Sequence, residues 1–101
     1  MSQSKNPAID SLQALFAKAT HDTLRCALLN EMVEAENDDK IWPTYNRQLK
    51  AICEKNLKSD GPYTDIFLSY LAQAGANYAY LLLQQGKDTE ALKIYKENLA
   101  I

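Results

Sequence analysis

Apolar positions recur every three or four residues along most of the chain, which is the period of an amphipathic helix. Prolines, glycines and polar turn residues divide this pattern into segments. The pattern and its breaks predict five helices, over residues 7–20, 22–36, 43–58, 62–85 and 89–101. No segment shows the sustained alternation of a strand. The sequence therefore predicts an all-α fold of five helices in antiparallel hairpins.

Each of the first three predicted helices has one apolar face. Asn6 and Pro7 favour a helix start as N-cap and first helical residue, and Pro43 opens the third helix. The apolar faces comprise Ile9, Leu12, Leu15, Phe16 and Ala19, then Leu24, Leu28, Met32 and Ala35, then Tyr45, Leu49, Ile52, Cys53 and Leu57. These faces suffice for one modest core, which predicts a single domain over residues 1–101.

The fourth predicted helix contains no charged residue from Ile66 to Gly86. A narrow polar stripe runs along it, made of Ser69, Gln73, Asn77, Tyr80 and Gln84. Because a membrane span needs about 20 predominantly apolar residues, this stripe favours a buried central helix over a transmembrane one. Gly86 then predicts the end of this helix, and Asp88 can cap the last one.

The last predicted helix has an apolar face that covers about half of its circumference. This face comprises Ala91, Leu92, Ile94, Tyr95, Leu99 and Ile101, with Asn98 among them. One antiparallel neighbour covers a stripe of about 100°, so part of the face needs a second neighbour. We expect self-association as a dimer in which Ile94, Asn98 and Ile101 meet their copies. A client helix, or the first three helices folding back, would cover the face instead.

Residues 75–101 resemble one tetratricopeptide repeat (TPR). The family pattern is W-x2-L-G-x2-Y, followed by a small residue and, four positions later, an aromatic one. The residues that match the pattern, exactly or by type, are Tyr78, Ala79, Leu82, Ala91 and Tyr95. Gly75 stands at the Trp position, and Asn98 stands where a small residue is usual. We expect the two alanines to let the helices approach closely, while Tyr78, Leu82 and Tyr95 fill the space around them.

The TPR resemblance implies protein or peptide binding in a groove lined by the first helix of the pair. Carried over to this chain, the groove residues are Ala76, Asn77, Tyr80, Leu83 and Gln84. An uncharged row with amides and a tyrosine suits hydrogen bonding to the backbone of a partner segment. The alternative interpretation is that the row faces solvent or pairs inside the fold.

Candidate catalytic and metal-ligating residues are sparse. His21 is the only histidine and is expected to be solvated or to cap a helix. Cys26 and Cys53 are too few for a disulfide framework and are predicted to be small buried hydrophobes in a reducing compartment. No spacing of these residues suits a metal site or a catalytic group. The sequence predicts no enzyme, no metal and no cofactor.

Charge and the N-terminus restrict the partners and the compartment. The formal charge is −2 with 11 Lys plus Arg, so we expect no general attraction to nucleic acid or membranes. A basic tendency in the third helix comes from Arg47, Lys50, Lys55 and Lys58. The first ten residues lack the apolar core of a signal peptide. We therefore expect a cytoplasmic protein.

The predicted function is protein binding, as an adaptor or small chaperone that shields an amphipathic helix or extended segment of a partner. Secretion-system chaperones look similar in size and TPR-like build. The alternative is a small inhibitor or immunity-type protein that docks an acidic run onto a basic enzyme site. This run consists of Glu31, Glu34, Glu36, Asp38 and Asp39. Binding through the acidic run should weaken steeply with salt, whereas binding through the groove should not.

Overall fold

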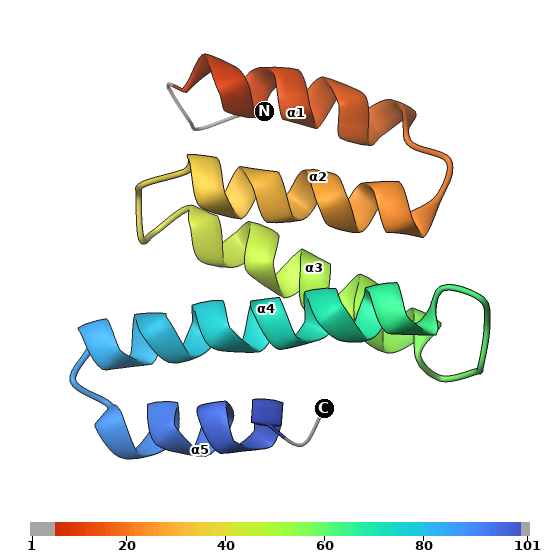
Figure 1. The fold of residues 1–101 in the computed structure, drawn as a ribbon. Coiled ribbons are helices and arrows are strands. Elements are labelled where there is room, and N and C mark those ends of the chain that lie inside the picture. Colours follow the sequence, from red (N-terminus) through yellow and green to blue (C-terminus); the bar gives the residue numbers. More distant parts are fainter. Residues whose placement is uncertain (1–5, 100–101) are drawn as a thin grey trace.

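Five helices lie side by side in chain order (Figure 1). The computed structural model describes residues 6–99, and for Leu99 the backbone alone. The helices are α1 (Pro7–Lys18), α2 (Asp22–Ala35), α3 (Trp42–Asn56), α4 (Thr64–Gln84) and α5 (Asp88–Leu99). Residues 6–99 contain no strand. The predicted all-α fold is confirmed.

The helices form a layer rather than a closed bundle. The Cα atoms extend over 37 × 35 × 15 Å, so the arrangement is much thinner in one direction than in the other two. Each helix packs against the next one along the chain, and α2 also contacts α4. Both α3 and α5 pack against α4, but within the described chain they do not contact each other.

Local sequence signals explain several helix ends. The Asn6 side chain caps α1 by accepting a hydrogen bond, 2.9 Å long, from the backbone N–H two residues later. The Nδ1 atom of His21 caps α2 in the same way at 3.1 Å, so the predicted capping role of His21 is confirmed. Gly86 adopts a left-handed φ of 76° just after α4, a conformation that glycine tolerates at a helix C-terminus.

Three helices start at positions that differ from the prediction. α3 begins at Trp42, one residue before Pro43, because proline fits the first turn of a helix. α4 begins at Thr64 rather than at residue 62, because the Thr64 hydroxyl donates to the Gly61 carbonyl at 2.9 Å and closes a turn there. α5 begins at Asp88 itself, so this carboxylate lies in the first turn and not at the cap.

Two clusters of buried side chains hold the layer together. The larger cluster lies among the first four helices, α1, α2, α3 and α4. It comprises Ile9, Ala19, Cys26, Leu28, Leu29, Met32, Val33, Trp42, Tyr45, Leu49, Cys53, Phe67 and Ala74. The smaller joins α4 to α5 through Ala79, Leu82 and Ala91, with Ile94 packed against it. Small side chains therefore dominate the contact that holds α5.

Some residues predicted on apolar faces lie at the surface. Leu15 and Leu24 are 54% and 49% exposed, so their assignment to core-facing stripes was wrong. The expected burial of the fourth helix is also only partly correct. α4 lies between α3 and α5, yet Tyr78, Tyr80 and Leu83 are exposed. Because most helices pack only against the next one along the chain, part of each helix surface stays without a neighbour, which the apolar pattern alone does not reveal.

Candidate functional site

A groove runs along α4 on the side where α3 and α5 flank it without touching each other. Its volume is about 500 Å³. The floor consists of Leu71, Ala74, Gly75, Tyr78 and Leu81 of α4. The α3 wall consists of Trp42, Pro43, Asn46, Arg47, Lys50 and Glu54, and the α5 wall of Ile94, Glu97 and Asn98. We call this feature the α3–α5 groove.

The α3–α5 groove combines an apolar floor with a charged rim. Tyr78 is 47% exposed on the floor, with a half-buried leucine on either side along α4. Arg47 and Lys50 on the α3 side and Glu97 on the α5 side are exposed, and none of them has an ion-pair partner within residues 6–99. An apolar centre with a polar, solvated rim is the usual composition of a protein–protein contact surface.

A buried asparagine fixes the α3 wall of the groove to α4. The Nδ2 atom of Asn46 donates to the Ala74 carbonyl at 3.0 Å, and its Oδ1 accepts from Nδ2 of Asn77 at 3.0 Å. Asn77 also accepts from Nε2 of Gln73 at 3.1 Å. Sequence reasoning missed Asn46, although a polar residue adjoining the predicted apolar face, next to Tyr45, is a signal that could have found it.

The α5 wall is attached to α4 by a matched pair of residues. The Nδ2 atom of Asn98 donates to the Ala72 carbonyl at 2.9 Å. Gly75 leaves room for this amide, because a Cβ at position 75 would lie only 2.5 Å from Oδ1 of Asn98. The two departures from the TPR pattern at Gly75 and Asn98 are therefore complementary, since the missing side chain on α4 accommodates the larger one on α5.

The packing of α4 against α5 agrees in part with the expected hairpin. Ala79 and Ala91 are fully buried at the contact and Leu82 packs beside them, as expected for a close crossing. Tyr78 and Tyr95, however, do not fill the space between the two helices. They are 47% and 36% exposed, so this part of the prediction was wrong.

The row predicted to line a TPR-type groove lies on the other open side of α4, and none of its residues lines the α3–α5 groove. Within it, Tyr80, Leu83 and Gln84 are exposed, whereas Ala76 and Asn77 are half-buried. On this side a shallow hollow lies between α2 and α4, lined by Asn30, Asp65, Ile66, Ser69, Tyr70 and Gln73. The Asn77 amide is hydrogen-bonded to Asn46 within the fold. For the other residues of the row, partner binding stays a prediction.

The predicted dimer face of α5 is partly occupied within the chain. Ile94 is half-buried against α4, and Asn98 is bonded to the α4 backbone. Ile101 lies outside the described residues. Among the α5 side chains that the structure describes, Leu92 and Tyr95 are the exposed large apolar ones. The apolar face of α5 is thus incompletely covered by α4, and self-association stays a prediction.

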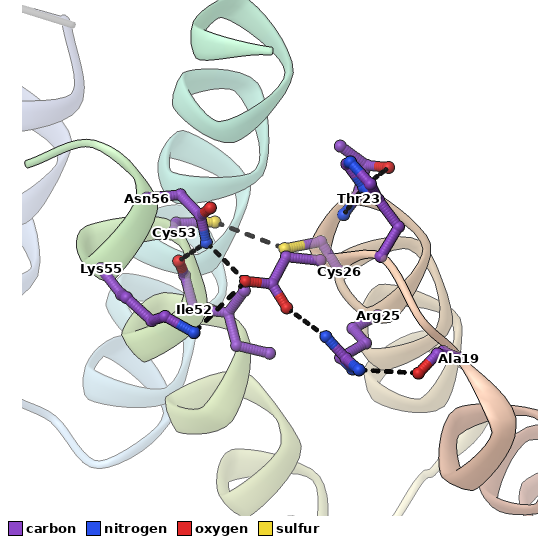
Figure 2. A network of polar contacts seen from close by, with 10 residues as sticks. Ala19, Thr23, Arg25, Cys26, Ile52, Cys53, Lys55 and Asn56 are labelled. Carbon is purple, nitrogen blue, oxygen red and sulfur yellow. Dashed lines mark hydrogen bonds and ion pairs between the residues drawn. The ribbon is translucent and has the colours of Figure 1, made fainter. Parts of the chain in front are cut away.

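A polar network joins the start of α2 to the end of α3 (Figure 2). The carboxylate of Asp22 accepts from Nη1 of Arg25 at 2.6 Å and from Nδ2 of Asn56 at 2.8 Å, and Nζ of Lys55 lies 3.6 Å away. The hydrogen bonds from Asn56 and Arg25 hold the pKa of Asp22 below its ordinary value. Ionised Asp22 therefore stabilises the contact between these two helices.

The two cysteines meet next to this network. The Sγ atoms of Cys26 and Cys53 are 3.8 Å apart, and both side chains are fully buried. Their burial as small core residues was predicted. Their proximity was not, because 27 positions separate them in the chain and no local pattern connects them.

The acidic run extends from α2 into the loop that follows it. In the loop after α2, Glu36 accepts from the backbone N–H of Asp38 at 3.2 Å, and Asp39 accepts from the indole N–H of Trp42 at 2.7 Å. Glu31 and Glu34 are exposed on α2 itself. Part of the run is thus used to shape the loop, and the structure provides no observation that favours the inhibitor alternative.

Between positions 6 and 99, no three His, Cys, Asp or Glu side chains are grouped so that they could hold a metal ion. None of the five helices has the length and apolar character needed to cross a membrane.

Comparisons with known proteins give no relative. No protein-family model, curated protein or solved structure matches this chain. The TPR-like interpretation of the last two helices therefore depends on their residues and packing alone.

Proposed function

We propose that this protein is a helical protein-binding module, an adaptor or small chaperone, that holds an amphipathic helix or extended segment of a partner in the α3–α5 groove. The observation that carries the proposal is the groove itself, an open hollow of about 500 Å³ with an apolar floor and exposed, unpaired charges at its rim. Pockets of about 300–1,000 Å³ are of the size that binds ligands and side chains.

The arrangement of α3, α4 and α5 suits a helix as the occupant. Both α3 and α5 pack against α4 and leave the space between them open. A partner helix in this space would contact all three and complete a four-helix arrangement, with its apolar residues on Tyr78. Tyrosines in such central positions often contribute much of the binding energy.

The opposite side of α4 offers a second, flatter surface to a partner. The predicted row of Ala76, Asn77, Tyr80, Leu83 and Gln84 lies there, with Tyr80 and Leu83 exposed. We assign binding to the α3–α5 groove in preference, because its floor is enclosed by two walls. We also assign this activity to the cytoplasm, the compartment expected from the sequence.

Two neighbouring tyrosines allow a direct test. Tyr78 and Tyr80 lie on the same helix and are 47% and 53% exposed, but only Tyr78 lines the groove. The partner would be captured from native lysate on the wild-type chain, identified by mass spectrometry, purified and titrated calorimetrically. Tyr78→Ala should weaken its binding by about tenfold or more, since a loss of about 1.4 kcal/mol is tenfold.

Tyr80→Ala is the matched control and should leave the affinity nearly unchanged. Circular dichroism and the melting temperature should be the same for both variants, because each side chain is about half exposed. The reverse result, with Tyr80→Ala as the damaging change, would place the binding surface on the predicted row. Equal and small losses for both variants would contradict binding in the α3–α5 groove.

A further inference from the structure

Cys26 and Cys53 belong to different helices and meet inside the larger core cluster. Cys26 lies on α2 and Cys53 on α3, and Figure 2 shows their sulfur atoms facing each other across the gap between the helices. The Sγ atoms are 3.8 Å apart. A disulfide requires a separation of about 2.05 Å. The two sulfurs are thus in van der Waals contact, and they would have to approach by about 1.8 Å to form the bond.

We propose that Cys26 and Cys53 form an intramolecular disulfide when the reduced protein reacts with a small-molecule disulfide such as oxidised glutathione, and that this bond fixes α2 to α3. The chain contains two cysteines, so an intramolecular bond has a single connectivity. The proposal concerns the contact between α2 and α3 and does not depend on partner binding in the α3–α5 groove.

The exchange proceeds in two balanced steps. The thiolate of one cysteine attacks one sulfur of oxidised glutathione, which forms a mixed disulfide and releases one glutathione thiolate. The thiol of the other cysteine then loses its proton and attacks the protein sulfur of the mixed disulfide, which releases the second glutathione as a thiolate. The two protein thiols lose two electrons and two protons in total, and one molecule of oxidised glutathione becomes two of reduced glutathione.

The surroundings of the pair determine the rate of these steps. Burial disfavours the thiolate form of both cysteines, while the hydrogen bond between the sulfurs stabilises whichever thiolate forms first. Because both side chains are fully buried, the oxidant reaches them only when α2 and α3 separate transiently. The reaction should be slow under native conditions and faster in urea below the unfolding transition.

The bond should stabilise the fold. It would close a loop between residues that are 27 positions apart, which restricts the unfolded chain. For a chain of this size we expect the melting temperature to rise by at least about 5 °C on oxidation and to return to its former value in dithiothreitol.

The experiment uses the reduced full chain incubated with oxidised glutathione. Intact-mass spectrometry should show the loss of two hydrogen atoms without an adduct, with release of two equivalents of reduced glutathione and a monomeric band in a non-reducing gel. Cys26→Ala and Cys53→Ala are the matched controls. Neither variant can lose two hydrogens within one chain, and neither should gain stability from the oxidant.

Other outcomes would overturn the proposal. A final product with two glutathione adducts, or one linked between chains, would show that the thiols do not bond to each other. The proposal would also be contradicted if both thiols stayed free although amide exchange showed that α2 and α3 open on the time scale of the incubation. An intramolecular bond that lowers the melting temperature would contradict the fixing of α2 to α3.

Discussion

The first part of the layer and its last helix are held in different ways. The larger core cluster is shared by the first three helices and α4. This cluster buries large side chains such as Leu29, Met32 and Leu49. α5 contacts α4 alone among the described helices, over a cluster in which Ala79 and Ala91 outnumber the single leucine. Burial of a leucine side chain contributes about 1.5–3 kcal/mol, and alanine contributes much less. α5 should therefore open locally at a lower free energy than the rest.

This difference gives the α3–α5 groove one firm wall and one weak wall. The α3 wall belongs to the larger cluster and is joined to α4 by the buried Asn46. The α5 wall depends on the alanine contact and on the hydrogen bond from Asn98. A partner helix in the groove would add contacts to α5 that the free protein lacks. Binding should therefore stabilise α5 more than α3.

The largest expected effect comes from one leucine in each cluster. Leu49→Ala should lower the free energy of unfolding by about 2–5 kcal/mol, because Leu49 is fully buried in the larger cluster. Leu82→Ala in the smaller cluster should mainly lower the amide-exchange protection of α5. Fluorescence of Trp42, the only tryptophan, reports on the larger cluster. If both changes moved the Trp42 transition equally, the chain would unfold as one unit and the comparison would fail.

The helix ends could be predicted because their signals are local. Asn6, Pro43 and Gly86 act on the backbone within one turn of their own positions. The neighbours of each helix could not be predicted in the same way. Helical spacing shows which face is apolar, but it does not show how many helices cover that face. Leu15 and Leu24 were misplaced for this reason, since a single layer leaves them exposed.

The candidate site depends on contacts between residues far apart in the chain. Asn46 bonds to a carbonyl 28 positions away, and Asn98 bonds to one 26 positions away. No local pattern encodes either contact. The TPR-like residues lie on α4 and α5, which provide the floor and one wall of the α3–α5 groove, but the groove also requires α3, which lies outside that pair. Tyr78 was therefore expected between the helices and not on the floor of a groove.

Overpacking tests the close approach that holds α5. Ala91→Leu should cost about 1–3 kcal/mol, because Ala91 is fully buried against α4 and has no space for a larger side chain. Urea unfolding followed by circular dichroism would measure this loss. Leu92→Ala is the control, since Leu92 is 54% exposed and its change should stay within about 0.5 kcal/mol. A neutral Ala91→Leu would show that the helices do not cross closely there.

Acid should weaken the first part of the layer through Asp22. The pKa of Asp22 is lowered in the folded state by hydrogen bonds from Asn56 and Arg25. The resulting stability is present above the unfolded pKa, about 3.9, and is lost as the pH falls through the lower folded value. Asp22→Asn should lower the free energy of unfolding by about 1–2 kcal/mol at neutral pH. When the pH is then lowered, the free energy of unfolding should fall less in this variant than in the wild type.

Urea unfolding at neutral and at acidic pH would measure this difference through the Trp42 transition. Asp60→Asn is the control, because Asp60 is exposed in the loop between α3 and α4 and has no ion pair within the described residues. An Asp22→Asn variant with the same acid loss as the wild type would show that other carboxylates carry the effect.

The smallest expected effect concerns Gly75 and Asn98 at the weak wall. Gly75→Ala alone should be nearly neutral, because a Cβ would displace the Asn98 amide from its bond to Ala72, while alanine favours the helix over glycine by about 1 kcal/mol. Asn98→Ala alone should cost about 1 kcal/mol for the lost hydrogen bond. Once Asn98→Ala has removed the clash, Gly75→Ala should stabilise the protein by up to about 1 kcal/mol. Unfolding free energies of the wild type, both single variants and the double variant give the coupling between the two positions. Additive effects would show that Gly75 does not make room for Asn98, and the attachment of α5 would then depend on the alanine contact alone.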